Sequence, residues 1–212
     1  MKDLIILGAG GMGRQVYLFA KNCKGYGVDY TIKGFLDDNL HAMDGYEDYP
    51  PVLGTIGGYQ IQANDIFFNS IGDVAAKKKC ITTILDKGGE FITLIHHTAG
   101  ISEGTKIGRG CMISARAGIG TETEIGDFCL IQDNAIIGHD VHVGKFCRID
   151  CNVVLIAGVR LDDGVCVHTS SVVNHKVHIG ENAMVGALSF VIRNVKPGTT
   201  VQGNPAKRII YE

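Results

Sequence analysis

A short histidine-rich stretch contains the densest set of side chains that could do chemistry. It reads Gly138-His139-Asp140-Val141-His142-Val143-Gly144. An imidazole with an ordinary pKa of about 6.5 can take up a proton at neutral pH, so His139 is a candidate general base. The carboxylate of Asp140 could fix the tautomer of that ring and stabilise the imidazolium that forms. Two polar residues on a solvated corner would give the same sequence, and this alternative stays open.

A second candidate site lies near the N-terminus. There the sequence Gly8-Ala-Gly10-Gly11-Met12-Gly13 separates an apolar stretch from a helical pattern. A G-x-G-x-x-G turn in this position lets backbone N–H groups and a helix N-terminus hold a phosphate. An expected strand near residues 30–36 ends in Asp37-Asp38, whose carboxylates could reach a ribose or a base. The alternative is a structural glycine turn followed by solvated acids.

The elements around the glycine-rich turn predict a small α/β domain. Residues 3–7, 30–36 and 66–72 have the pattern of buried strands, and residues 14–21 and 74–86 that of helices. Residues 39–62 predict a loop with a short element. We therefore expect a Rossmann-like nucleotide-binding domain over residues 1–92, about half the size of a dinucleotide fold and suited to one nucleotide.

The His139 stretch belongs to a repeat of six residues. Every sixth residue from Ile95 to Val191 is aliphatic, and the residue four places later is small or β-branched. This period fits short straight segments with a corner every six residues, stacked into an all-β solenoid over residues 93–212. Glycine often follows the aliphatic residue, and we expect it to supply an unusual φ at each corner. Those glycines are Gly108, Gly126, Gly138, Gly144, Gly180 and Gly186. The alternative is a β-sandwich with coincidental spacing.

Composition narrows the function classes. The net charge of −2 and the lack of basic runs argue against a nucleic-acid surface. No apolar run approaches the ~18 residues of a membrane span, and no signal-peptide pattern is present. Three of the seven cysteines, Cys111, Cys129 and Cys147, occupy the small-residue position of the repeat, which predicts compact core residues rather than disulfides or metal ligands. We therefore expect a cytoplasmic protein.

The chain after the repeat reads Val201-Gln-Gly-Asn-Pro-Ala-Lys207. Such a tail could cap the open end of the solenoid, because exposed strand edges invite association. Lys207 could also face the anionic phosphates of a cofactor, and the two roles are compatible.

These motifs together resemble a known family. The repeat is similar to that of hexapeptide acyltransferases, which form a left-handed parallel β-helix of three hexapeptides per coil, so about five coils are expected here. The glycine loop, Gly34-Phe-Leu-Asp-Asp38, Leu94-Ile-His96, Gly-His-Asp and the tail are similar, in the same order, to the sialic-acid O-acetyltransferase-like family. That family includes UDP-4-amino-sugar N-acetyltransferases of bacterial glycan synthesis.

The resemblance implies a homotrimeric acetyltransferase that uses acetyl-CoA and a nucleotide-linked amino sugar, without a metal. His139 would be the base and Asp140 its acidic neighbour. The implied nucleotide-sugar residues are Gly10, Gly11, Met12, Asp37, Asp38, Gly72 and Gln132. The implied acetyl-CoA residues, between neighbouring solenoids, are Arg148, Ala157, Gly158, Gly186, Ala187 and Lys207.

Three positions depart from the family pattern. The family commonly has His at the position of Met12 and often Asn at that of Gln132, and some members have a second His at that of Arg148. These departures leave the identity of the sugar open, and an O-acetyltransferase acting on a sugar hydroxyl is the first alternative.

Two other classes of protein remain as alternatives. His139 and His175 are 36 residues apart, as are His142 and His178, so each pair would lie on one column of the solenoid. Hexapeptide-type carbonic anhydrases place zinc-binding histidines two coils apart in this way and complete the site across a subunit interface, and a catalytic zinc ion takes three such ligands and an open position. A non-catalytic structural solenoid is the other class.

Overall fold

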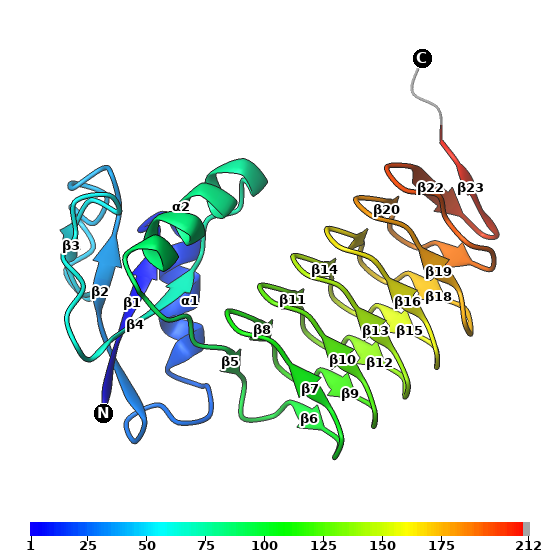
Figure 1. The fold of residues 1–212 in the computed structure, drawn as a ribbon, viewed down its shortest axis with the longest axis horizontal. Helices are drawn as coiled ribbons and strands as arrows, with labels where there is room; N and C mark the ends of the chain where they lie inside the picture. The colour runs from blue at the N-terminus through cyan, green and yellow to red at the C-terminus, as the bar shows by residue number, and fades with distance from the viewer. Residues whose placement is uncertain (210–212) are drawn as a thin grey trace. The chain divides into compact units, whose positions relative to one another are not determined.

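The structure is a computed structural model and describes residues 1–209. It divides into two compact units, Met1–Leu94 and the chain from Ile95 onward. Figure 1 shows an α/β unit first and a stack of triangular coils second. The division falls two residues beyond the 92/93 boundary that the sequence suggests.

The first unit is a parallel four-stranded sheet with two helices. Its strands are β1 (Lys2–Leu7), β2 (Tyr30–Leu36), β3 (Val52–Gly54) and β4 (Asp65–Asn69), in the order β3-β2-β1-β4. The helices are α1 (Gly11–Ala20) and α2 (Val74–Asp86). The three strands and two helices expected from the sequence are present, and β3 is the short element within residues 39–62.

The burial of β1 explains this arrangement. Residues Leu4 to Leu7 are fully buried, as expected for a strand covered on both faces of a parallel sheet. β1 pairs with β2 on one side and with β4 on the other. The connections therefore reverse direction beside β1, and in parallel sheets such a switch point at the carboxyl ends of the strands is where ligands bind.

The second unit is a parallel β-helix of two-residue strands. The strands are β5 (Leu94–Ile95), β6 (Gly100–Ile101), β7 (Lys106–Ile107), β8 (Met112–Ile113), β9 (Gly118–Ile119), β10 (Glu124–Ile125), β11 (Leu130–Ile131), β12 (Ile136–Ile137), β13 (His142–Val143), β14 (Arg148–Ile149), β15 (Val154–Leu155), β16 (Arg160–Leu161), β17 (Cys166–Val167), β18 (Val172–Val173), β19 (His178–Ile179), β20 (Met184–Val185) and β21 (Phe190–Val191).

These strands form the three faces of a prism. The first face is the sheet β5-β8-β11-β14-β17-β20, which β22 (Thr200–Gly203) and β23 (Ala206–Arg208) extend. The second face is β6-β9-β12-β15-β18-β21, and the third is β7-β10-β13-β16-β19. Each strand pairs in parallel with the strand 18 residues further on, as Ile131 does with Ile149. Within residues 1–209 this gives five complete coils, with β20 and β21 beginning a sixth, close to the predicted number.

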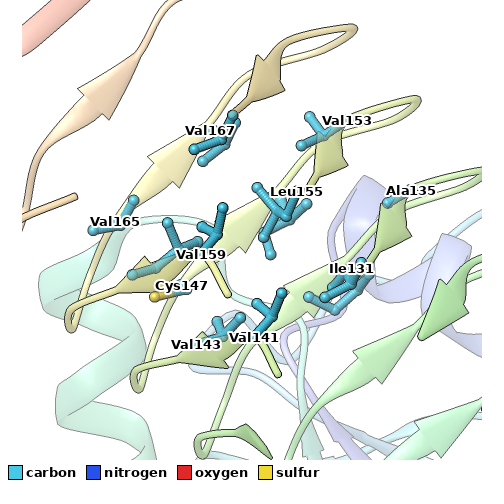
Figure 2. Close-up of a cluster of buried hydrophobic side chains, with 14 of the residues drawn as sticks. Ile131, Ala135, Val141, Val143, Cys147, Val153, Leu155, Val159, Val165 and Val167 are labelled. Carbon is cyan, nitrogen blue, oxygen red and sulfur yellow. The ribbon is translucent and has the colours of Figure 1, made fainter. Parts of the chain in front are cut away.

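The aliphatic repeat is the core of the β-helix. Ile131, Val143, Leu155 and Val167 are fully buried and point into the prism (Figure 2). Cys111, Cys129 and Cys147 are buried, and all seven cysteines are free, which confirms their predicted role as compact core residues. In addition, each of these three thiols donates a hydrogen bond to a backbone carbonyl 15 residues further along the chain.

The expected role of the repeat glycines is wrong. The left-handed residue comes three places after the aliphatic residue, and eleven non-glycine side chains occupy it, including Asp140 with φ 55°. The repeat glycines are required by close stacking instead. A Cβ on Gly126 would lie 2.8 Å from the carbonyl carbon of Gly144, and one on Gly138 would lie 2.8 Å from the nitrogen of Ala157.

The tail closes the first face. β22 (Thr200–Gly203) pairs in parallel with β20, and β23 (Ala206–Arg208) pairs with β22 in antiparallel. Val201 is buried against the end of the core, so the tail acts as the predicted cap. Neither helix within residues 1–209 has the length and apolar character that crossing a membrane takes.

Candidate functional site

His139 and Asp140 form an exposed pair at a corner of the prism. They lie in the turn from β12 to β13, between the second and third faces. His139 Nδ1 is 2.6 Å from Asp140 Oδ2, and the two side chains are 62% and 65% exposed. Because a carboxylate can only accept, Nδ1 carries the proton of this hydrogen bond. Nε2 is then the nitrogen with a free lone pair, which is the arrangement that a general base needs.

Ala157 and Gly158 lie at the same corner, one coil further on. The backbone N–H of Gly158 donates a 3.0 Å hydrogen bond to the carbonyl of His139. The N–H of Lys176 reaches the carbonyl of Ala157 in the following coil, which places the exposed His175 in the same column. The structure thus brings the two candidate catalytic residues next to two of the candidate cofactor residues.

The other candidate residues of the β-helix lie away from the His139 corner. Gln132, between β11 and β12, and Gly186-Ala187, between β20 and β21, occupy the corner between the first and second faces. Gln132 Oε1 accepts a hydrogen bond from Cys151 Sγ at 3.2 Å. Arg148 lies on β14 of the first face, and Lys207 is exposed on β23 at the end of that sheet. Within one chain, Gln132, Gly186 and Ala187 therefore lie at a different corner from His139, and Arg148 and Lys207 lie on the first face.

The glycines of the glycine-rich turn are of two kinds: some are required by close packing, and others have open space beside them. Gly8 has φ +93°, and a Cβ on Gly13 would overlap the carbonyl oxygen of Gly8, so both are required by the turn from β1 into α1. Gly10 and Gly11 have open space where a Cβ would be. Gly10 is the N-cap of α1 and makes no side-chain cap, and the first turn has no acidic residue. This helix terminus is therefore suited to an anion.

The two acids after β2 hold this turn and the β3 region in place. Asp37 accepts hydrogen bonds from the N–H of Ala9 at 2.8 Å and from the N–H of Asn39 at 2.9 Å. Asp38 accepts one from the N–H of Ile56 at 3.3 Å. Asp37 thus supports the glycine-rich turn directly, which its sequence position alone did not indicate. Each carboxylate oxygen still has a lone pair for a ligand.

The remaining candidates of the first unit lie at the same edge of the sheet. Met12 is 46% exposed in the first turn of α1. Gly72 is exposed just after β4, whose end is bound to the turn because Ser70 Oγ donates to the carbonyls of Leu7 and Gly8. The structure therefore gathers Gly10, Gly11, Met12 and Asp37 around one turn, with Gly72 at the end of the neighbouring strand.

Arg14 also lies at this turn, although no sequence motif singled it out. Its guanidinium lies 3.9 Å from the ring centre of Tyr46, and Nη1 donates to the carbonyl of Ala9 at 3.4 Å. It therefore stands beside the open glycines, on the loop side of α1. The signal was present, because a cation directly after the third glycine of the motif is well placed for a phosphate.

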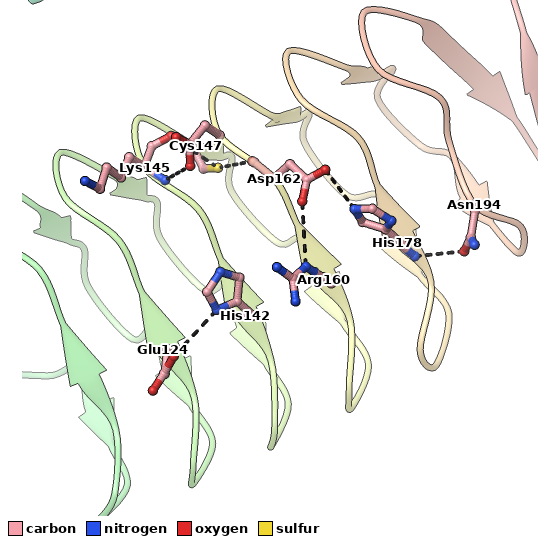
Figure 3. Close-up of polar contacts among 9 residues, drawn as sticks. Glu124, His142, Lys145, Cys147, Arg160, Asp162, His178 and Asn194 are labelled. Atoms are coloured by element: carbon pink, nitrogen blue, oxygen red, sulfur yellow. Dashed lines mark hydrogen bonds and ion pairs between the residues drawn. The ribbon is translucent and has the colours of Figure 1, made fainter.

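The third face carries a ladder of charged side chains (Figure 3). Lys106, Glu124, His142, Arg160 and His178 follow one another in register on neighbouring strands. A shallow cavity of about 410 Å³ lies over its Lys106 end. Burial is slight there, and the hydrogen bond from Lys106 lowers the pKa of Glu124.

The spacing that suggested zinc does produce columns of histidines. However, Arg160 lies between His142 and His178, and His178 Nε2 is bonded to Asp162 Oδ2 at 2.8 Å. Within residues 1–209 no group of three His, Cys, Asp or Glu side chains could hold a metal ion. The ladder therefore has the character of a surface network of ion pairs.

Together, these features define a class of protein: an α/β unit with an open glycine turn, joined to a parallel β-helix with an exposed His–Asp pair. Comparison with known proteins finds the same two parts. Residues 3–84 match the family profile described as the PglD N-terminal domain, and residues 92–184 match that of the GMPPB C-terminal domain. Comparison with curated protein sequences gives no match.

Solved structures match over nearly the whole chain. The acetyltransferase domain of PglB from Neisseria gonorrhoeae FA1090 is 24% identical with a TM-score of 0.86, covering 99% of this chain and 100% of that one. PerB from Caulobacter crescentus, in complex with CoA and GDP-perosamine, is 24% identical with a TM-score of 0.86, covering 99% and 98%. WeeI from Acinetobacter baumannii AYE is 19% identical with a TM-score of 0.85, covering 99% and 100%.

These matches confirm the predicted fold class, an α/β unit followed by a left-handed parallel β-helix. The match of residues 3–84 to the PglD N-terminal domain also agrees with the motifs that predicted a nucleotide-binding domain there.

Proposed function

We propose that this protein is an acetyl-CoA-dependent acetyltransferase that N-acetylates a UDP-linked 4-amino sugar. The observation that carries the proposal is the His139–Asp140 pair, whose Nδ1 is held by a carboxylate while Nε2 is free at an exposed corner. The full-length fold match to the PglB acetyltransferase domain and to PerB supports it.

The proposed reaction is direct transfer within one ternary complex. The sugar amine attacks the thioester carbonyl, His139 Nε2 takes the proton from the amine, and the CoA thiolate leaves. Asp140 stabilises the imidazolium that results. Backbone N–H groups at the corners of the β-helix stabilise the developing oxyanion. No Ser or Cys is needed as a covalent nucleophile.

The first unit is the proposed handle for the nucleotide. The N–H groups of Gly10 and Gly11 and the adjacent Arg14 suit the diphosphate, and Asp37 and Asp38 suit hydroxyl or base N–H donors. Met12, Gly72 and Gln132 complete the proposed sugar-nucleotide residues. PerB was solved with a GDP-linked sugar, so the identity of the base requires a direct test.

The β-helix is the proposed acetyl-CoA site. Small residues leave room for an extended chain, and the exposed cations Arg148 and Lys207 suit its phosphates. The proposed residues are Arg148, Ala157, Gly158, Gly186, Ala187 and Lys207. Because these residues are divided between the His139 corner and the region of the first face, we propose that the cofactor binds between neighbouring β-helices of a homotrimer. Closed symmetry is the usual form of an oligomer. The free cysteines suit a reducing cytoplasm.

A thiol-release assay tests the proposal. Acetyl-CoA is offered with UDP-, GDP- and dTDP-linked 4-amino sugars, CMP-sialic acid, free sialic acid and free amino sugars. Thiol release with a UDP-linked amino sugar supports the full proposal. Release only with a GDP- or dTDP-linked amino sugar would replace uracil by another nucleobase in the proposed substrate. Release only with a sialic acid would replace the amine by a hydroxyl acceptor, and no release with any acceptor would contradict acetyl transfer.

A further inference from the structure

Arg148, one of the proposed cofactor residues, belongs to a polar cluster with Asp150 and His168, which have no role assigned so far. Asp150 Oδ1 accepts a 2.6 Å hydrogen bond from Arg148 Nε, and Asp150 Oδ2 is 2.9 Å from His168 Nδ1. The Asp150 side chain is only 6% exposed, whereas those of Arg148 and His168 are 51% and 31% exposed. A buried carboxylate therefore holds two partly exposed groups in fixed orientations.

The β-helix does not need this carboxylate to turn its corner. Asp150 follows β14, and the residues at the same place in neighbouring coils are Ser114, Gln132, His168 and Gly186. A small residue or an amide turns the corner equally well. Removing a carboxylate from water costs several kcal/mol unless it is paired and hydrogen-bonded. A role for the side chains that Asp150 orients accounts for its presence.

The hydrogen bond to Asp150 determines what His168 offers. Since the carboxylate can only accept, the ring proton is on Nδ1 and Nε2 is the acceptor. Arg148 uses Nε for Asp150, which leaves its two terminal nitrogens as donors. The cluster therefore presents one fixed acceptor next to a fixed cation.

We propose that His168 Nε2 accepts a hydrogen bond from an amide N–H of the cofactor's pantetheine arm. This inference rests on the proposed function. Arg148 comes just before the corner between the first and second faces, Gly186 lies at that corner two coils later, and His168 lies at it in the coil between. Neighbouring strands are about 4.8 Å apart, so an extended ligand that contacts both Arg148 and Gly186 passes His168. Pantetheine is such a chain, and its secondary amides carry the N–H donors that a neutral imidazole nitrogen accepts.

The test compares binding of CoA by calorimetry with the KM values of acetyl-CoA and of the sugar substrate. His168→Ala should weaken CoA binding and raise the KM of acetyl-CoA by about tenfold, the size of one hydrogen bond, with the sugar KM and kcat little changed. His168→Gln keeps an acceptor near the position of Nε2 and should stay within about threefold of the wild type. The melting temperature of each variant verifies folding.

His178→Ala is the matched control. His178 is also a partly exposed histidine bonded to an aspartate, Asp162 at 2.8 Å, but it lies on the third face. It should leave CoA binding unchanged. Unchanged CoA binding in His168→Ala, or equal losses in the two alanine variants, would overturn the inference. If CoA binds and depends on His168 but no acceptor is acetylated, only the proposed function fails. If the wild type does not bind CoA, both fail.

Discussion

The geometry of the His139–Asp140 pair follows from one backbone angle. Asp140 is at the left-handed position of its corner, with φ 55°. The chain turns at this corner, and the side chains of His139 and Asp140 meet at 2.6 Å. On a regular strand, two neighbouring side chains would point to opposite faces. The same position carries other residue types at other corners, so the pair depends on residue identity and not on a special fold of this coil.

At the level of single residues, Arg14 gives a direct prediction. Arg14→Ala should raise the KM of the nucleotide sugar by roughly tenfold or more, the size of a hydrogen bond to a charged group, and leave the KM of acetyl-CoA unchanged. Lys21→Ala is the control, since Lys21 is an exposed cation near the other end of α1. Steady-state kinetics would contradict the diphosphate role of Arg14 if both variants behave alike.

The sequence alone predicted those candidate site residues that occupy a fixed position in a short motif. It found His139, Asp140 and the open glycines, because each has a fixed place in a short pattern. It did not find Arg14 or the hydrogen bond from Ala9 to Asp37. These depend on how the loop after β2 folds against α1, which no local pattern specifies.

At the level of elements, the β-helix is held together by close stacking of its repeat glycines. Gly126→Ala should lower the free energy of unfolding by about 2 kcal/mol, because the added Cβ would lie 2.8 Å from the carbonyl carbon of Gly144. Gly100→Ala is the control, since a Cβ there meets nothing within 4 Å. Urea denaturation measures both, and equal stabilities would show that stacking does not require glycine at position 126.

The sheet of the first unit contains an ion pair that predicts a pH dependence. Burial acts to raise the pKa of Asp65, but Lys33 at 2.7 Å, the N–H of Gln62 and the hydroxyl of Tyr59 together lower it below its ordinary value. A lowered folded-state pKa gives stability that is fully present above the unfolded pKa of about 3.9 and is lost as the pH falls through the folded pKa.

Lys33→Met removes the partner of this buried carboxylate. It should destabilise the first unit by about 3 kcal/mol at pH 7. Because burial raises the pKa of an Asp65 that has lost its cation, protonation relieves the loss, and the difference from the wild type should shrink as the pH falls from 7 towards 3. Denaturation curves between pH 3 and 7 measure this, and a difference that does not change with pH would contradict the account.

The six-residue period predicted the β-helix, but it could not explain its glycines. A sequence repeat shows that the residue type at a position is restricted in every coil. It does not show whether a backbone φ angle or close contact with the next coil causes the restriction. Only the stacked coils show that the glycines are needed for contact and that Asp140 and its equivalents adopt the left-handed φ.

For the whole molecule, the separation of the proposed cofactor residues within one β-helix leads to a prediction about assembly. If the cofactor binds between neighbouring β-helices, the active form is a trimer. Light scattering should give a mass of three times the 22.7 kDa chain. The mass should not change on dilution to assay concentrations. A monomeric mass with full transferase activity would refute a site shared between chains.

The central claim is acetyl transfer with His139 as the base, and one comparison tests it most directly. The rate of thiol release from acetyl-CoA with the best nucleotide-linked amino sugar is measured for the wild type, His139→Ala and His175→Ala. His175 is the control because it is an exposed histidine in the same corner column, two coils further on. We predict a loss of roughly 10²–10⁴-fold in His139→Ala and wild-type turnover in His175→Ala. Near-normal turnover in a folded His139→Ala protein would contradict the account.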